Sequence, residues 1–372
     1  MPRRLVLHIG MHKTGTTAIQ SALAGYDDGQ TRMARLGGQN HSIPMLTAFA
    51  ADPTRYHVWV RQGLAADEVL RRRDIFRARL AGEMALERAQ LLVSGEEMSL
   101  MHAPSVRAMV GTLAPQAGAV DALAWLRPAR DYIGSAFQQM VKAGQAVPDL
   151  PRPRYRARIE PYLDVLGRGA VHLHLYDPAR EGSSVAAFCR AVGLPPQAVP
   201  DRTENTALSD DALRLVWALN RSGIATSGSA ARLAARSRLI GHLAGRHPGP
   251  LRLPAGAVDA GLDPADIDWA QGITGLVLDD GPAIGADAAK ALLQDWLQAH
   301  DPAALDRLDE DLQIIHRRLP PQATLPQRLA TLYQAFLDEV EAEQALAPVF
   351  RAGNRVLNAG ARDRTRTDTP GG

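Results

Sequence analysis

The fold of this chain is indicated by a stretch near its N-terminus, Leu5-Val-Leu-His-Ile-Gly-Met-His-Lys-Thr-Gly-Thr-Thr-Ala-Ile-Gln20. It opens with an apolar run suited to a buried strand and continues into a loop from Gly10 to Gly15. After the loop, one helical face carries the apolar residues Ala18, Ile19, Ala22 and Leu23. A strand, a loop and a helix N-terminus in this order present unpaired backbone N–H groups at one point, which favours binding of a phosphate or sulfate group.

Three further apolar runs predict strands at residues 91–93, 122–126 and 171–175, with helical sequence between them. This alternation predicts an α/β fold, a three-layer core with a mainly parallel sheet. We interpret residues 26–88 as an insertion over the sheet on the acceptor side, ending in a helix from residue 67.

The second half of the chain is expected to be largely helical. Ser209 can cap a helix that starts at Asp210, and an apolar stripe with helical spacing runs through Leu329, Leu332, Tyr333, Phe336, Leu337 and Val340. The predicted organisation is a core over residues 1–220, a helical region over 221–350 and a disordered, Arg-rich tail over 351–372.

Composition excludes several classes of protein. With 372 residues and 46% hydrophobic content the chain can bury a large core, and its net charge of +2 argues against nucleic acid as a partner. Cys189 is the single cysteine, which excludes an intrachain disulfide. The sequence has no signal peptide and no run of about 18 to 20 apolar residues, so we expect a cytoplasmic protein without a membrane span.

The loop does not fit the Walker A pattern of ATPases, because His12 and not glycine precedes Lys13, and Gly15 follows it. The segment Lys13-Thr14-Gly15-Thr16-Thr17 instead resembles the 5′-phosphosulfate loop of sulfotransferases that use 3′-phosphoadenosine 5′-phosphosulfate (PAPS). That family's loop usually reads Pro-Lys-Ser/Thr-Gly-Thr-Thr, so His12 stands where many members have proline. The alternative is a helix cap by Thr14 or Thr16 with Lys13 merely exposed.

A second motif, Leu126-Arg-Pro-Ala-Arg-Asp-Tyr-Ile-Gly-Ser135, follows the third predicted strand. In the family, an Arg that ends this strand and a Ser eight residues later bind the donor's 3′-phosphate, and Arg127 and Ser135 match that spacing. A guanidinium offers a bidentate grip on phosphate oxygens, and a hydroxyl adds a directed donor. The alternative is an ordinary surface pair of Arg127 with Asp131.

Sulfuryl transfer to an alcohol also needs a general base, and the family uses a Glu or a His. Glu96 follows the second predicted strand and resembles the glutamate of a Ser-Ser-Glu segment in bacterial members; alternatively it orients Lys13 or caps the next helix. Glu97, His41 and His12 are rival bases. Asn205 either contacts the nucleotide or fixes a turn, and we expect His8, His172 and His174 to be packing residues within strands.

The resemblance covers about residues 1–220 and implies an enzyme that moves a sulfuryl group from PAPS to a hydroxyl on a carbohydrate, glycolipid or small metabolite. The attack would be in line, with Lys13 stabilising the leaving phosphate oxygen and with no metal. Two alternatives stay open: an ATP-dependent small-molecule kinase and a non-catalytic nucleotide-binding protein.

Overall fold

The computed structural model describes residues 1–200, 207–224, 228–279, 281–317, 319–320 and 322–364, the last 19 of them as helical backbone only. The chain divides into two compact units. The first comprises Met1–Ala136, Leu150–Asn205 and Val258–Ala286, and the second comprises Phe137–Asp149, Thr206–Ala257 and Asp287–Gly372.

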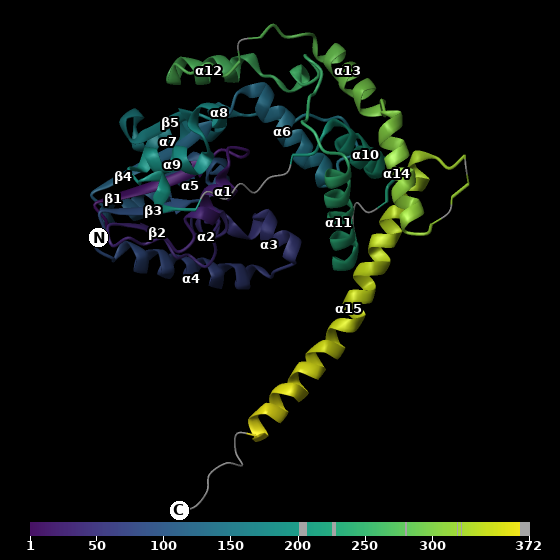
Figure 1. Ribbon diagram of the computed structural model, residues 1–372. Helices are drawn as coiled ribbons and strands as arrows, with labels where there is room; N and C mark the ends of the chain where they lie inside the picture. Colours follow the sequence, from purple (N-terminus) through teal and green to yellow (C-terminus); the bar gives the residue numbers. More distant parts are fainter. Residues whose placement is uncertain (201–206, 225–227, 280, 318, 321, 365–372) are drawn as a thin grey trace, which may run out of the picture. The chain divides into compact units, whose positions relative to one another are not determined.

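The first unit is built on a five-stranded sheet in the order β2-β3-β1-β4-β5, in which every pair of neighbours is parallel (Figure 1). The strands are β1 (Arg4–Gly10), β2 (Thr31–Met33), β3 (Gln90–Ser94), β4 (Ala119–Leu126) and β5 (Val171–Leu175). The sheet confirms the predicted α/β fold, and four of its strands lie where the sequence predicted them. Because the strands are parallel, the segments after β1, β3 and β4 all leave from the same edge of the sheet.

Strand β2 was not predicted. Residues 26–88 were predicted to form an insertion over the sheet, but Thr31–Met33 pairs with β3 and forms the edge strand of the sheet itself. Its central residue, Arg32, is buried and ion-paired with Glu83 at 2.7 Å and Asp27 at 2.5 Å. A three-residue strand with a charged centre has no apolar alternation, so local sequence patterns cannot reveal it.

Helices cover the sheet of the first unit. They are α1 (Thr16–Ala22), α2 (Ser42–Phe49), α3 (His57–Gln62), α4 (Ala66–Met84), α5 (Ala103–Leu113), α7 (Tyr155–Leu166), α8 (Pro178–Glu181), α9 (Ser184–Val192) and α12 (Pro264–Thr274). Ile19 of α1 and Phe188 of α9 pack on one face of the sheet with Val6 and Trp125. The alternate residues of β1, Leu5, Leu7 and Ile9, are fully buried too, so both faces are covered and the core has three layers.

The second unit is helical in the part that the structure describes. Its helices are α10 (Asp210–Arg221), α11 (Ala230–Arg246), α13 (Ala286–Gln298), α14 (Pro302–Ile314) and α15 (Leu325–Arg364), and α6 (Ala129–Lys142) belongs in part to each unit. Ser209 caps α10 as predicted, because its hydroxyl accepts from the Ala212 N–H at 3.2 Å. The stripe of α15 packs against α11, with Leu329 and Leu332 almost fully buried.

Two features differ from the predicted organisation. Residues 258–286 group with the sheet, where Asp259 pairs with Arg130 at 3.0 Å and Asp266 accepts from the Tyr155 N–H at 2.7 Å. Helix α15 continues through Arg364, into the stretch expected to be disordered, while residues 365–372 lie outside the described part of the chain. That stretch has no proline before residue 370, and its Ala, Leu and Arg residues favour a helix. None of the described helices is long and apolar enough to cross a membrane.

Candidate functional site

The loop after β1 is held by its own hydroxyl groups. Thr14 Oγ1 donates to the Met11 carbonyl at 2.6 Å, and Thr16 Oγ1 lies 3.4 Å from the same oxygen; both threonines are buried, whereas Thr17 is exposed. Lys13 has a φ of 67°, in the left-handed region that a residue with a side chain adopts only when its surroundings impose it. The hydroxyls of Thr14 and Thr16 therefore shape the loop, and donors for a ligand would come from its backbone and from Lys13.

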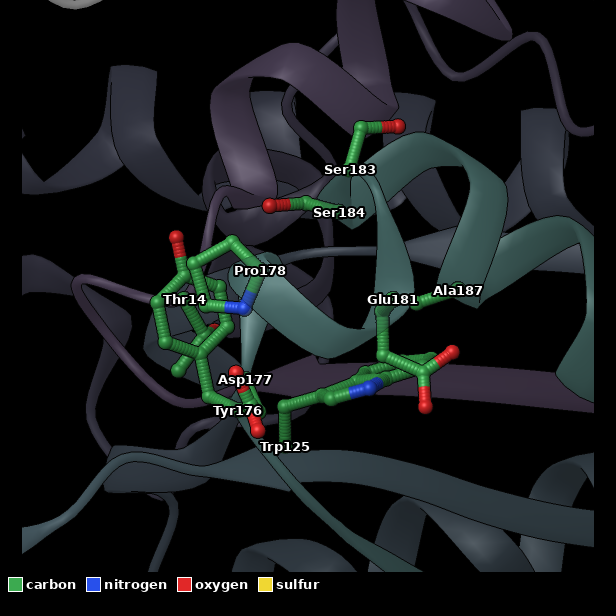
Figure 2. Close-up of a pocket in the computed structure, with 9 residues that line it drawn as sticks. All are labelled: Thr14, Trp125, Tyr176, Asp177, Pro178, Glu181, Ser183, Ser184 and Ala187. Atoms are coloured by element: carbon green, nitrogen blue, oxygen red, sulfur yellow. The ribbon is translucent and has the colours of Figure 1, made fainter.

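Helix α9 approaches this loop closely. A Cβ atom on Gly15, whose φ is 76°, would lie 2.0 Å from Ser184 Oγ in the first turn of α9, so only glycine fits there. Figure 2 shows a small pocket at this approach, and most of its wall comes from segments after β5. Its lining residues are Thr14, Trp125, Tyr176, Asp177, Pro178, Glu181, Ser183, Ser184 and Ala187.

Arg127 lies directly after β4 and contacts the loop. Its Nη1 donates to the Lys13 carbonyl at 2.8 Å, and its guanidinium lies 5.3 Å from the centre of the Tyr176 ring. Arg127 Nε is buried without a hydrogen-bond partner in the part of the chain that the structure describes, and burial lowers the pKa of the guanidinium. Within the described residues Arg127 forms no ion pair with Asp131, which is exposed. The surface-pair alternative is thus absent from the structure, and one donor of Arg127 remains to be satisfied.

The other residues of the second motif occupy α6. Ser135 is partly exposed, about 9 Å along the helix axis from its first residue. Arg130 has a structural role: it donates to Asp259 and Asp279 and so fixes residues 259–279 to the start of α6. Lys13 and Arg127 meet directly, whereas Ser135 only shares the helix that follows Arg127.

The two glutamates after β3 differ in their surroundings. They begin a short 3-10 helix (Glu96–Leu100). The backbone of Glu96 lies close to Gly10, since a Cβ atom added to Gly10 would be 3.0 Å from Glu96 Cα. Glu97 accepts from Tyr56 Oη at 2.5 Å and lies 3.1 Å from His57 Nε2. The Glu96 carboxylate has no hydrogen-bond partner among the described residues; burial and the neighbouring Glu97 raise its pKa, while Lys13 and Arg158 act in the opposite direction.

The rival histidine bases are engaged by the protein. His41 is buried; its backbone N–H donates to the Ser94 carbonyl at 2.8 Å, its Nδ1 accepts from the Ser94 N–H at 3.1 Å, and burial lowers its pKa to about 4. His12 Nδ1 lies 3.2 Å from an Arg158 nitrogen, and burial and then the Arg158 charge lower its pKa to about 4. Nδ1 of each imidazole thus already has a partner in the protein, whereas the Glu96 carboxylate has none among the described residues.

Two strand histidines lie in packed surroundings, as expected. His8 is buried between Trp125 and Phe188 with Nδ1 at 2.8 Å from Ser94 Oγ, and burial lowers its pKa to about 3. His174 stacks on Trp125, with ring centres 5.2 Å apart. Asn205 lies outside the described residues.

Sequence reasoning missed Arg158, a buried residue of α7 that contacts His12 in the loop. It lies in an Arg-rich stretch without any motif, so nothing in the sequence separates it from its surface neighbours. The described residues contain no cluster of His, Cys, Asp or Glu that could hold a metal ion.

No protein-family model matches the sequence, and no curated protein matches it. Among solved structures, the chain is similar to a sulfotransferase from Alicyclobacillus acidocaldarius at 17% sequence identity, over 61% of this chain and 94% of that chain. The TM-score of this similarity is 0.34, which is too low to support a conclusion about this chain.

Proposed function

We propose that this chain is a sulfotransferase that moves a sulfuryl group from PAPS to a hydroxyl group of its acceptor. The observation that carries the proposal is the hydrogen bond from Arg127 Nη1 to the Lys13 carbonyl at 2.8 Å. It joins two motifs that are 114 positions apart, each of which resembles one half of a PAPS site. Two cations at neighbouring strand ends suit a ligand with phosphate groups at both ends of a nucleoside.

The residues fit such a donor. Arg127 Nε is buried and has no hydrogen-bond partner among the described residues, so a phosphate oxygen would satisfy it, and Ser135 of α6 would add a hydroxyl donor. Lys13 would stabilise the negative charge on the phosphate oxygen that leaves, which is where charge develops in the transition state. When bound, PAPS supplies the sulfuryl group.

Glu96 is the proposed base. Its raised pKa makes the carboxylate a better proton acceptor, and its location beside the loop fits proton removal from a hydroxyl near the donor. In the proposed reaction the acceptor oxygen forms a bond to sulfur, the bond from sulfur to the 5′-phosphate oxygen breaks, and the acceptor proton passes to Glu96. The acceptor we propose is a hydroxyl of a carbohydrate, a glycolipid or a small metabolite.

Calorimetric titration with adenosine 3′,5′-bisphosphate, the product left after transfer, tests the donor. We expect tight binding to the wild-type protein, weak binding of ATP, and loss of bisphosphate binding in Arg127→Ala. Arg156→Ala is the matched control, because it removes the same charge from an exposed position paired with Glu160. No preference for the bisphosphate over ATP would overturn the proposal in favour of an ATP-dependent kinase.

Glu96→Gln separates an enzyme from a non-catalytic nucleotide-binding protein. The substitution keeps the size of the side chain but removes the proton acceptor. We expect the variant to bind the bisphosphate like the wild type and to transfer almost no radiolabelled sulfuryl group from PAPS to a panel of sugars and phenols. Equal transfer by variant and wild type would exclude Glu96 as the base.

A further inference from the structure

Arg158 is a buried guanidinium whose hydrogen-bond partners are all uncharged. The residue is 8% exposed and lies in α7. It donates to the Pro153 carbonyl at 2.8 Å, to Ser99 Oγ at 3.0 Å, to His12 Nδ1 at 3.2 Å and to Tyr132 Oη at 3.3 Å. The side chain is thus fixed in position while its charge is left without a direct counter-charge.

No carboxylate of the described residues lies within ion-pair distance of Arg158. Removing a guanidinium from water without a compensating negative charge costs free energy, and proteins normally avoid it by pairing the group. Of the charged groups nearby, Lys13 has the same sign, and the Glu96 carboxylate interacts electrostatically with Arg158 but does not form an ion pair with it. The missing counter-charge is therefore expected from a bound anion.

The contacts of Arg158 reach each segment of the proposed site. His12 is in the loop directly before Lys13, Ser99 is in the 3-10 helix that begins with Glu96, and Tyr132 is in α6 between Arg127 and Ser135. One side chain thus connects the loop, the segment of the proposed base and the helix of the second motif.

The contact with His12 defines the state of the imidazole. Because Nδ1 accepts a hydrogen bond from Arg158, the ring is neutral and its proton is on Nε2. Many proteins with a similar loop have proline at this position, where a ring restricts the backbone. Here the hydrogen bond to a buried guanidinium holds the residue before Lys13 in place and leaves an N–H donor on the loop.

We propose that Arg158 is a further residue of the donor site: it positions the loop through His12 and supplies positive charge for the 5′-phosphosulfate end of the donor. The inference rests on the proposed function and adds to it a residue that neither motif contains. It predicts that Arg158 acts on the 5′ end of the nucleotide, whereas Arg127 acts on the 3′ end.

The test compares two ligands by calorimetry, adenosine 3′,5′-bisphosphate and adenosine 3′-monophosphate, which lacks the 5′-phosphate. Arg158→Met keeps an unbranched apolar stem and removes the charged guanidinium, and Arg156→Met is the control on an exposed position of the same helix. We expect Arg158→Met to bind the bisphosphate about tenfold more weakly or worse, which is the scale of one charge-assisted contact. Its affinity for the 3′-monophosphate should stay that of the wild type.

Two variants of His12 keep Arg158 in place and so avoid a folding defect from the buried charge. His12→Asn retains an acceptor near the position of Nδ1 and should bind the bisphosphate much like the wild type, while His12→Ala should bind it more weakly. Wild-type affinity of Arg158→Met for the bisphosphate, or an equal loss for both ligands, would overturn the inference. A wild-type protein that does not prefer the bisphosphate over ATP would instead overturn the proposed function.

Discussion

Gly15→Ala probes the contact between the loop and α9. Two separate effects should destabilise the variant. The φ of 76° is a left-handed conformation that costs a residue with a Cβ atom about 1 to 2 kcal/mol. The new Cβ would also lie 2.0 Å from Ser184 Oγ and 2.4 Å from Ser184 Cβ, an overlap that forces α9 or the loop to shift.

The size of the second effect follows from the geometry. Overpacking in a tightly packed region costs about 1 to 3 kcal/mol, so the free energy of unfolding should fall by about 2 to 5 kcal/mol in total. Gly25→Ala is the matched control, because Gly25 has the same φ of 76° but nothing within 4 Å of its added Cβ. It isolates the conformational cost, so Gly15→Ala should lose about 1 to 3 kcal/mol more than Gly25→Ala.

Urea unfolding, followed by circular dichroism, measures both variants and the double variant Gly15→Ala with Ser184→Gly. Ser184→Gly removes both atoms of the overlap and leaves Ser184 Cα at 3.9 Å from the added Cβ. Gly15→Ala should therefore lower the free energy of unfolding much less in the Ser184→Gly background than in the wild type, because most of the overlap cost is gone. Equal stability of Gly15→Ala and Gly25→Ala would refute the close approach of α9 to the loop. If the loop binds the donor, Gly15→Ala should also weaken binding of adenosine 3′,5′-bisphosphate, while Gly25→Ala should not.

Three further predictions concern charge and protonation. Lys13→Ala should lower kcat/KM for sulfuryl transfer, by an amount that corresponds to a loss of about two to four kcal/mol of transition-state stabilisation. Near-wild-type turnover would exclude the proposed role of Lys13. His41 is buried and neutral with a pKa lowered from 6.5 to about 4, so its contribution of up to about 3 kcal/mol is complete above pH 6.5 and is lost as the pH falls toward 4. Urea unfolding at a series of pH values should therefore show a smaller loss of stability on acidification for His41→Asn than for the wild type, and equal slopes would contradict this assignment. Glu97→Gln should lower stability by about 1 to 2 kcal/mol, because the bonds from Tyr56 and His57 lose a charged acceptor, while bisphosphate affinity stays unchanged; loss of that affinity would place Glu97 in the donor site instead.

The local sequence patterns were sufficient for the fold class. Four strands and the loop after β1 were predicted from short apolar runs and glycine positions, because a buried strand needs apolar side chains whatever packs against it. The cap at Ser209 was predicted for the same reason, since a helix end is satisfied by residues next to it in the chain. The two motifs of Lys13 and Arg127 were also identified from the sequence, but the hydrogen bond from Arg127 Nη1 to the Lys13 carbonyl at 2.8 Å was found only in the structure.

Contacts between distant parts of the chain were decided by the tertiary structure alone. Strand β2 pairs with β3 and carries Arg32, which is ion-paired with Glu83 and Asp27, and the ring and backbone of His41 are hydrogen-bonded to Ser94. The sequence determined the fold class and the candidate motifs because periodicity, capping and glycine positions are local properties. Only the tertiary structure revealed the buried charge of Arg158, because burial and the absence of a counter-charge depend on which segments pack together, and no local pattern records that.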